Sequence, residues 1–389
     1  MNTTYIAGAA TTRFGKFLDT SLATLANEAV DAALDDAGVR PEDVGFVAFG
    51  NATSSVISGQ AMIQGQLALL DGKLAGAQIV NVENACASSS SALHLAMMAV
   101  ASGNCDVAVA VGAEKMAHLD KTRAFDALGR AIDVTTPLAA ENSSRSSVFM
   151  ELYAQEARQY AAATGATPEA FAHAAATMHF HGSLNPKAQY RDAHTVEEIL
   201  ASRMIADPLT LLMCSPIGDG AAAIVITRAR PDRDPIAITG AALRSGLRNE
   251  GGALVTRAAE AALEQAGRKA SEIDVIELHD AASPASLLVL EETGVVSEGE
   301  AWKLALDGQL RFDGRVPVNT SGGLISRGHP VGATGAAQIV ELADQLRGRA
   351  GARQVANAEI AMAQNAGGAV SLGDQFTAAV CAVTVLERV

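Results

Sequence analysis

The chain has 389 residues, of which 49% are hydrophobic but only 4% aromatic, with 35 glycines and a formal net charge of -14. Its length predicts two core-forming units, and its glycine-rich, aromatic-poor composition favours closely packed α/β layers over an all-β sandwich. The acidic charge argues against nucleic acid or an anionic membrane surface as the main partner, because either would require a basic face.

The amino-terminal segment MNTTYIAGAATTRF has no charged start followed by a long apolar core, and no stretch of about 18 apolar residues occurs in the chain. We therefore expect a soluble, cytoplasmic protein that does not enter a membrane. The four cysteines, at positions 86, 105, 214 and 381, form no CxxC pair and have no clustered histidines beside them. The sequence thus predicts neither a disulfide framework nor a metal site.

An internal repeat is the first organised feature along the chain. The segment 22–51, LATLANEAVDAALDDAGVRPEDVGFVAFGN, matches 252–280, GALVTRAAEAALEQAGRKASEIDVIELHD, when Gly38 is laid on Gly267. Each copy has the pattern of an amphipathic helix, a glycine stop, a short acidic turn and a buried strand. We therefore expect two copies of one α/β unit, which form two pseudo-symmetric halves.

Each repeat is followed by a second strand, a loop rich in glycine or serine, a helix and a further strand. The strand and loop are IVNVENACASSSS at 79–91 in the first half and VPVNTSGGLISRGHPVGATG at 316–335 in the second. The segment 117–213 lacks this order and is predicted to be an insertion that caps one end of the sheets, where ligands of α/β folds bind. The predicted domains are 1–116 with 214–235, the insertion 117–213, and 236–389.

Cys86 lies at a predicted strand-to-helix junction, before an Ala/Leu/Met-rich helix. The positive end of the helix dipole and the unpaired backbone N–H groups there favour the thiolate, the nucleophilic form of cysteine. His329 occupies the equivalent junction of the second half, before Pro330, and His279 ends a buried strand where the first copy has Gly50. Together the three residues form an acyl-transfer constellation: a thiolate, a base that activates it and donors for an enolate oxygen.

Over nearly its whole length the sequence resembles the thiolase superfamily. The resemblance rests on the nucleophile motif CAS at 86–88, on SGGLISRGHPVGATG at 321–335 and on NAGG at 365–368. The pair His279-Asp280 stands where the commoner thiolases have asparagine in a NEAF-like motif, and in this the chain is similar to the sterol-carrier-protein-type branch. The resemblance implies a thiolase fold, a five-layered α-β-α-β-α sandwich, and a homodimer that takes a coenzyme A thioester under the insertion.

The resemblance also assigns roles to individual residues. Cys86 would be acylated, and His329 would take its proton and then help to hold the oxygen of the departing enolate. His279 would complete that oxyanion site, while the backbone N–H groups of Cys86 and of Gly367-Gly368 would hold the acyl oxygen on the cysteine. The expected activity is thiolytic cleavage of an aromatic or branched 3-oxoacyl-CoA, such as benzoylsuccinyl-CoA, with coenzyme A as cosubstrate and no tightly bound cofactor.

The second catalytic cysteine of thiolases is absent. Its place after the His-Asp pair is Ala281, and the carboxyl-terminal loop offers Gln364 and Asn365, neither of which titrates. Three interpretations follow. The enzyme is a thiolase in which another group, such as His279 or ordered water, gives the proton; or it is a retro-aldolase or condensing enzyme on the same fold; or it is a nonenzymatic lipid or acyl carrier, in which an intact cysteine–histidine pair would have no purpose.

Contacts to coenzyme A are expected from two parts of the chain. The insertion supplies the candidate phosphate ligands Arg145, His181, Lys187 and Arg191. A pantetheine channel could be bordered by small residues, namely Ser321, Gly322 and Gly323. Members of this branch without the second cysteine are often found with a small zinc-ribbon/OB-fold subunit, so the resemblance admits a hetero-oligomer with such a subunit.

Overall fold

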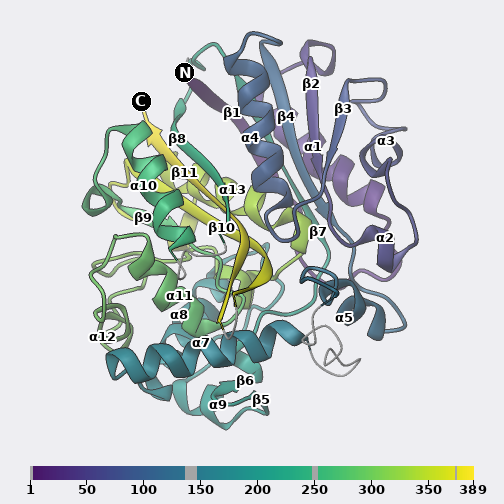
Figure 1. Ribbon diagram of the computed structural model, residues 1–389. Helices are drawn as coiled ribbons and strands as arrows, with labels where there is room; N and C mark the ends of the chain where they lie inside the picture. The colour runs from purple at the N-terminus through teal and green to yellow at the C-terminus, as the bar shows by residue number, and fades with distance from the viewer. Residues whose placement is uncertain (1–2, 136–146, 248–252, 373–374) are drawn as a thin grey trace.

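The computed structural model describes residues 3–135, 147–247, 253–372 and 375–389. Its main feature is one mixed sheet, in which strands of both halves are joined edge to edge (Figure 1). In spatial order its nine strands are β3 (Ile79–Val82), β2 (Phe46–Gly50), β4 (Val107–Glu114), β7 (Gly220–Thr227), β1 (Thr4–Thr11), β8 (Ile236–Ser245), β11 (Gln375–Arg388), β10 (Ile360–Leu372) and β9 (Val275–Glu277). The halves meet where residues 4–6 of β1 pair with β8.

Helices connect these strands and cover them. The described α-helices are α1 (Leu22–Ala37), α2 (Ser54–Ile57), α3 (Gln64–Ala68), α4 (Ser88–Ala101), α5 (Thr122–Leu128), α7 (Val148–Thr164), α8 (Pro168–Leu184), α9 (Val196–Ala201), α10 (Leu254–Ala266), α11 (Ser283–Glu292), α12 (Ala301–Leu306) and α13 (Thr334–Leu346). None of them is both long enough and apolar enough to cross a membrane.

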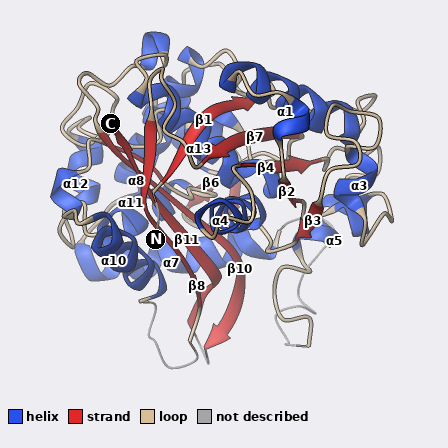
Figure 2. Cartoon of the chain, turned by 90° about the horizontal axis from the view of Figure 1, so that it is seen from above, coloured by secondary structure: helices blue, strands red, loops and turns tan. Residues whose placement is uncertain are grey.

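The helices lie in layers on either side of the two halves of the sheet (Figures 1 and 2). One hydrophobic core joins α1 to the outer face of the first half, and another joins α10 and α11 to the outer face of the second. A third core joins α4 and α13 to strands of both halves, so these two helices form the central layer. The order helix, strand, helix, strand, helix confirms the predicted five-layered α/β architecture.

The two predicted copies adopt the same succession of elements. Both α1 and α10 end at a glycine with positive φ, 62° at Gly38 and 65° at Gly267. Each glycine is followed by a 3-10 turn, at 41–43 and at 270–272, and then by a buried parallel strand, β2 or β9. A residue with a side chain is disfavoured at this left-handed position, which explains why the glycine stop was a reliable signal in the sequence.

The segment between β4 and β7 forms a separate layer under the strands. It contains α5, α7, α8 and α9 and a two-stranded ribbon, β5 (Met204–Ala206) and β6 (Leu209–Thr210). In Figure 1 α7, α9 and the ribbon lie below the sheet, and α7 passes beneath α11. This segment therefore closes one end of the fold.

The carboxylate of Glu114, at the end of β4, fastens the two halves together. It accepts hydrogen bonds from Asn51 Nδ2 at 2.8 Å and Thr53 Oγ1 at 2.7 Å, and from the backbone N–H groups of Ala52 at 3.0 Å and Gly332 at 2.9 Å. Burial raises the pKa of Glu114, but these donors counteract that rise because each stabilises the charged form. Since Gly332 belongs to the second half, the bond to it holds the loop that also carries the predicted base.

Replacing this carboxylate by an amide should destabilise the protein. In Glu114→Gln an NH2 group would replace one acceptor oxygen and face buried donors, so we expect the free energy of unfolding to fall by about 3 kcal/mol. Urea denaturation followed by circular dichroism measures this. The matched control is Glu83→Gln, at an exposed glutamate of the same half, which should stay within about 0.5 kcal/mol of the wild type. Equal stabilities for the two variants would contradict the role of Glu114.

Candidate active site

Cys86 is held in a tight turn between β3 and α4. Ala85 has a φ of 48°, and the turn is closed by hydrogen bonds from Ala87 N to Asn84 O at 3.0 Å and from Ser88 N to Ala85 O at 3.1 Å. The Ser88 hydroxyl reinforces it by accepting from Asn84 N at 2.9 Å and donating to Ala85 O at 2.7 Å. The residue Cys86 is 9% exposed, and it lines a cavity.

His329 is oriented by a threonine at the start of α13. Its Nδ1 lies 2.7 Å from Thr334 Oγ1, and the Thr334 hydroxyl lies 3.0 Å from Pro330 O. The hydroxyl has one hydrogen, which it donates to the Pro330 carbonyl, so it accepts from His329 Nδ1–H. The Nε2 of His329 therefore carries a lone pair and can act as a base.

His279 has the opposite tautomer. Its backbone N–H donates to Gln364 Oε1 at 3.0 Å, which fixes the end of β9 against β10. Its Nδ1 lies 3.3 Å from Asn365 Nδ2, while Asn365 Oδ1 has no partner among the described residues. With the amide donating in this orientation, Nδ1 accepts and Nε2 carries the hydrogen. His279 thus presents a donor to the cavity, where His329 presents an acceptor.

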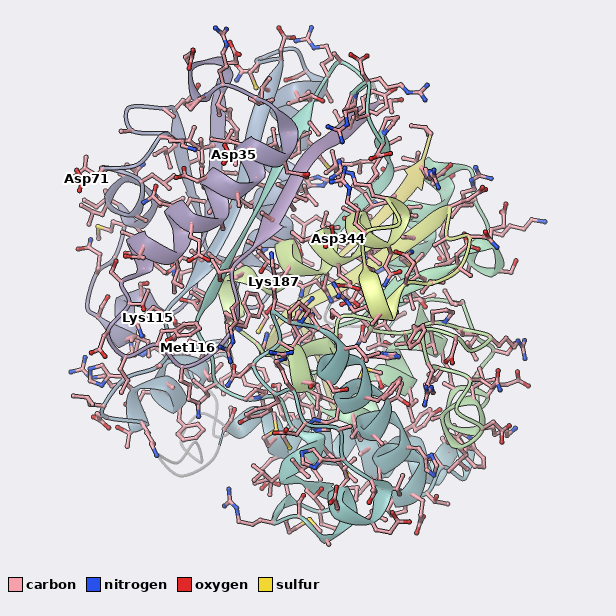
Figure 3. The ribbon with its side chains drawn as sticks, turned by 180° about the vertical axis from the view of Figure 1, so that it is seen from behind. Asp35, Asp71, Lys115, Met116, Lys187 and Asp344 are labelled. Atoms are coloured by element: carbon pink, nitrogen blue, oxygen red, sulfur yellow. The ribbon has the colours of Figure 1, made fainter. Side chains whose placement is uncertain are left out.

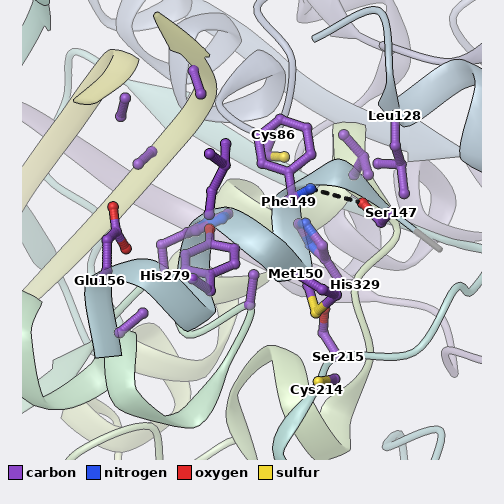
Figure 4. A pocket seen from close by; sticks show the side chains of 18 of the residues that line it. Cys86, Leu128, Ser147, Phe149, Met150, Glu156, Cys214, Ser215, His279 and His329 are labelled. Carbon is purple, nitrogen blue, oxygen red and sulfur yellow. Dashed lines mark hydrogen bonds between the residues drawn. The ribbon is translucent and has the colours of Figure 1, made fainter. Parts of the chain in front are cut away.

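The fold brings these three side chains to one point. The Cys86 sulfur and one ring nitrogen from each histidine all lie within 4.8 Å of one another, and the two rings meet edge to face with centroids 5.2 Å apart. Figure 4 shows the three around one pocket. The backbone N–H groups of Gly368 and of Cys86 itself point to the sulfur. A Cβ at Gly367 would lie 2.6 Å from Asn84 O, so the strand approaches the cysteine turn this closely only as glycine.

A thiol and two imidazoles at this spacing could also hold a soft metal ion such as Zn²⁺. A metal would need a lone pair from each ring. With the Asn365 amide donating to Nδ1 of His279, the cavity-facing Nε2 carries the hydrogen and offers no lone pair to a metal. The donor-plus-acceptor arrangement suits proton transfer and oxyanion binding better than metal binding.

Burial keeps the cysteine and the histidines uncharged. Removal from water raises the pKa of Cys86 to about 12, the charge of Glu114 adds to this, and the N–H of Gly368 opposes it. Burial lowers the pKa of His329 well below its ordinary value, and it lowers that of His279 to about 4. The sequence led us to expect a thiolate favoured by the helix dipole. That expectation was wrong for the resting site, because desolvation outweighs the dipole.

Comparisons with known proteins agree with this geometry. The chain matches the family profile "Thiolase, N-terminal domain" over residues 4–230 and "Thiolase C-terminal domain-like" over residues 252–378. The chain belongs to the thiolase family. It is a thiolase-type acyltransferase by fold, by the motifs at 86–88 and 321–335, and by its relatives.

Three relatives illustrate the range of the family. An acetyl-CoA acetyltransferase of Methanothermobacter thermautotrophicus is 39% identical over 93% of this chain and 96% of its own length. The benzoylsuccinyl-CoA thiolase subunit BbsB of Thauera aromatica is 32% identical over 90% of this chain and 91% of its own. A solved structure of an Ltp2-ChsH2(DUF35) aldolase has a TM-score of 0.78 and 27% identity, and covers 100% of this chain and 98% of that chain.

The cavity of this thiolase has a volume of about 570 Å³. Its rim includes the exposed cations Lys16 and Arg203, and its interior is lined mainly by apolar side chains. Ala281, where the second cysteine of the family was expected, also lines it. Cys381 does not, because it is buried in a hydrophobic core beside Gln364.

Of the residues predicted to bind coenzyme A, those that the structure describes do not line this cavity. Arg145 lies outside the described residues. His181 is fully buried, with Nδ1 3.0 Å from Asn319 O and Nε2 3.0 Å from Phe312 N, so neither ring nitrogen is available to a phosphate. Arg191 is exposed and does not line the cavity, although its neighbour Tyr190 does.

Lys187 and the glycine-rich turn have structural contacts instead. Lys187 Nζ donates to Thr11 O at 2.6 Å, and in the back view it lies at the seam between the halves near Asp344 (Figure 3). The Ser321 hydroxyl donates a hydrogen bond to Glu277 Oε2 at 2.7 Å. Gly322 and Gly323 have φ of 100° and 58°, and a Cβ at Gly323 would lie 2.1 Å from Asp280 Oδ2, so the glycines let this turn close over a buried carboxyl.

Several cavity residues were missed in the sequence. They come from one face of α7 and the facing side of α11, and they include Tyr153, Glu156, Gln159 and Glu292. Their spacing along α7, three residues apart, is the ordinary spacing of one helix face. No local signal distinguishes such residues from those of a solvated face, so only the packing of α7 over the strands reveals them.

The uncharged state of the resting site can be tested by alkylation. Because Cys86 is a thiol at neutral pH, its reaction with iodoacetamide should become faster as the pH rises and should show no plateau between about pH 6 and pH 9. Peptide mass spectrometry distinguishes alkylation of Cys86 from that of Cys105. Cys105 serves as the reference because it is partly exposed, and burial also raises its pKa. A Cys86 alkylation rate that is constant from about pH 5 upward would indicate a preformed thiolate–imidazolium pair instead.

Proposed function

We propose that the protein cleaves a 3-oxoacyl-CoA with coenzyme A through an acyl-Cys86 intermediate. The observation that carries the proposal is the meeting of two histidine rings with one buried thiol, in which the sulfur and one nitrogen of each ring lie within 4.8 Å of one another. His329 Nε2 takes the proton of Cys86 as the sulfur attacks the 3-oxo carbon. The N–H groups of Cys86 and Gly368 hold the acyl oxygen, and His279 Nε2–H holds the oxygen of the departing enolate. Coenzyme A then takes the acyl group from the cysteine.

Coenzyme A is proposed to enter at the rim that carries Lys16 and Arg203. Both are exposed cations beside the cavity, so they could pair with its phosphates, while the reactive end reaches inward to Cys86. No tightly bound cofactor is required by this chemistry. The role replaces the one expected for His181, whose ring nitrogens are both occupied.

An aromatic or branched acyl group is the proposed substrate class. A volume of about 570 Å³ with mainly apolar walls accommodates more than an acetyl group. Glu156 and Glu292 face the same space, and burial raises their pKa values to about 7 and about 8, so near neutral pH only a fraction of them is charged. That charged fraction would repel a carboxylate on the acyl chain. We therefore favour an uncharged aromatic or branched group, and benzoylsuccinyl-CoA, the substrate in the name of the Thauera relative, would have to turn its free carboxylate away from this wall.

The quaternary state is proposed to be a homodimer formed along β3, with a DUF35-type subunit as an added partner. β3 is an edge strand, and around it lie exposed apolar side chains, namely Met62, Ile63, Leu67, Leu70 and Val80. An exposed edge with such a patch is typical of an interface. The second partner is supported by the solved Ltp2-ChsH2(DUF35) aldolase, whose name includes a DUF35 component.

The first test asks whether Cys86 becomes acylated and whether coenzyme A is needed. With benzoylacetyl-CoA and no coenzyme A, mass spectrometry should show one acyl group on Cys86, and added coenzyme A should release two thioester products. Cys86→Ala should show neither. The competing aldolase function, favoured by the structural neighbour, predicts cleavage of a 3-hydroxyacyl-CoA to an aldehyde or ketone with Cys86 unmodified and no need of coenzyme A; that result would refute the proposal.

The second test separates the two histidines. His329→Ala should slow acylation of Cys86 by about a hundred- to a thousandfold, because no base then accepts the thiol proton. His279→Ala should still acylate from a simple acyl-CoA, but should lose the carbon–carbon step by a similar factor. Stopped-flow release of coenzyme A reports acylation, and product analysis reports cleavage. Equal acylation by His329→Ala and the wild type would overturn the assignment.

A further inference from the structure

The proposed cleavage leaves an enolate that must receive a proton on carbon. Ala281 stands where other thiolases have the second cysteine that acts as the acid, and the nearby Gln364 and Asn365 do not titrate. Burial lowers the pKa of His279 to about 4, so its N–H belongs to a neutral ring, which binds an oxyanion but would become an imidazolate if it gave that proton away. His329 would have to serve both the sulfur and the carbon with one nitrogen.

Tyr153 is a hydroxyl-bearing residue of the same cavity that has no role so far. It belongs to α7 and lines the cavity together with Cys86, His279 and Ala281. Its ring packs against a small hydrophobic cluster that contains Ala282, the neighbour of the alanine in the cysteine position. Within the described residues its hydroxyl has no hydrogen-bond partner, and the side chain is half-buried at the cavity wall. An unpaired hydroxyl at a cavity wall can serve a ligand.

The electrostatic surroundings of Tyr153 tie it to the reacting centre. Burial raises its pKa well above the ordinary value, and the charges that Glu156, Cys86 and Asp280 can carry raise it further. Tyr153 therefore lies within electrostatic reach of both the nucleophile and a second carboxyl. As a weakly acidic phenol it stays protonated in the resting site, which is the form needed to protonate an enolate.

Glu156 lies one helical turn beyond Tyr153, on the same face of α7. Figure 4 shows it in the pocket on the side of His279. Burial raises the pKa of Glu156 to about 7, and it raises that of Glu292, from α11, to about 8, with the charge of Glu156 contributing to the latter. Neither carboxyl forms an ion pair with a described residue. A carboxyl that titrates near neutral pH can both give and take protons.

We propose that Tyr153 is the acid and base for the α-carbon, in place of the absent second cysteine, and that Glu156 returns its proton. This rests on the proposed acyl-Cys86 function. In cleavage the C2–C3 bond breaks, its electron pair goes to C2, and the Tyr153 O–H transfers its proton to that carbon. Protonated Glu156 then reprotonates the tyrosinate. When coenzyme A attacks the acyl-cysteine, its thiol proton goes to the Glu156 carboxylate, and the Cys86 sulfur leaves with the proton held on His329.

Cys214 is the competing acid in the same cavity. Its thiol donates to Thr210 O at 3.3 Å, and burial raises its pKa to about 12. In Figure 4 it lies on the His329 side of the pocket, beyond Ser215, and away from Glu156. A thiol that is already paired with a carbonyl is less suited to the carbon than the unpaired phenol.

The test follows two reactions of acetyl-CoA in the same sample. Acetylation of Cys86 is measured by mass spectrometry, and exchange of the methyl protons with D2O is measured by proton NMR. For Tyr153→Phe we expect acetylation at the wild-type rate and exchange slowed by about 100-fold or more, since only the second reaction needs an acid and base at carbon. For Glu156→Gln the exchange should continue but lose the change in rate near pH 7.

Two variants control for damage to the helix and for the competing thiol. Tyr160→Phe removes another hydroxyl from α7, one that is bonded to Glu291 at 2.6 Å and does not line the cavity, and it should leave both reactions unchanged. Cys214→Ala should also leave both unchanged. Exchange that is lost in Cys214→Ala, or undiminished in Tyr153→Phe, would overturn the inference while leaving the acyl-cysteine function intact.

Rescue provides an independent measurement. The double variant Tyr153→Phe/Ala281→Cys places the family acid back in the cavity, so exchange should recover at least about tenfold over Tyr153→Phe. A purely structural role for Tyr153 predicts no recovery. If the wild-type enzyme shows no acetylation of Cys86 at all, the proposed function itself is wrong; acetylation without any exchange in the wild type would reject Tyr153 as the carbon acid.

Discussion

The close contact between the first turns of α4 and α13 is the constraint on which the rest of the structure depends. A Cβ at Gly112 would lie 2.5 Å from Ser89 Cβ and 2.6 Å from Gly332 O, and one at Gly335 would lie 1.9 Å from Ser90 Oγ. A side chain at Gly335 would push the two helices apart, and one at Gly112, on β4, would push Ser89 and the turn at 331–333 away from that strand. The nucleophile and the base come from the loops that lead into these helices, so the distance between them is set by this contact and by the carboxylate of β4.

The same packing removes water from the site, and this decides its charge state. A helix amino terminus typically stabilises an adjacent anion by about 0.3–1 kcal/mol. Burial of the Cys86 sulfur has the larger effect and raises its pKa to about 12. A neutral pair is consistent with a mechanism in which the proton moves to His329 only as the sulfur attacks. The backbone N–H groups then meet a charge that appears during the reaction, which is where preorganised dipoles are most effective.

The repeat was sufficient to predict two α/β halves and a common site for Cys86, His279 and His329, because it placed each residue at a strand end of one half; the resemblance to thiolases implied the five layers. The strands β3 and β9 lie at opposite edges of the sheet, and the strand ends meet because the two halves pack against the central helices α4 and α13. It was not sufficient for the insertion. His181 was proposed as a phosphate ligand from its charge and position, but the face of α8 that it occupies is turned inward, where Asn319 and Phe312 take both ring nitrogens. The direction of a helix face depends on packing partners that are distant in the sequence.

The insertion also changes where acid–base chemistry can come from. In the proposed mechanism the two halves supply the groups for acyl transfer, and α7 of the insertion supplies the phenol and the carboxyl for the α-carbon. Thiol exchange on Cys86 needs only the first set, whereas breaking a carbon–carbon bond needs both. The carbon step therefore depends on how firmly α7 is docked against α11, which is separate from the contact that fixes the nucleophile. Loosening α7 should uncouple the two reactions, because it moves Tyr153 and Glu156 while leaving the turn at Cys86 and the loop at His329 in place.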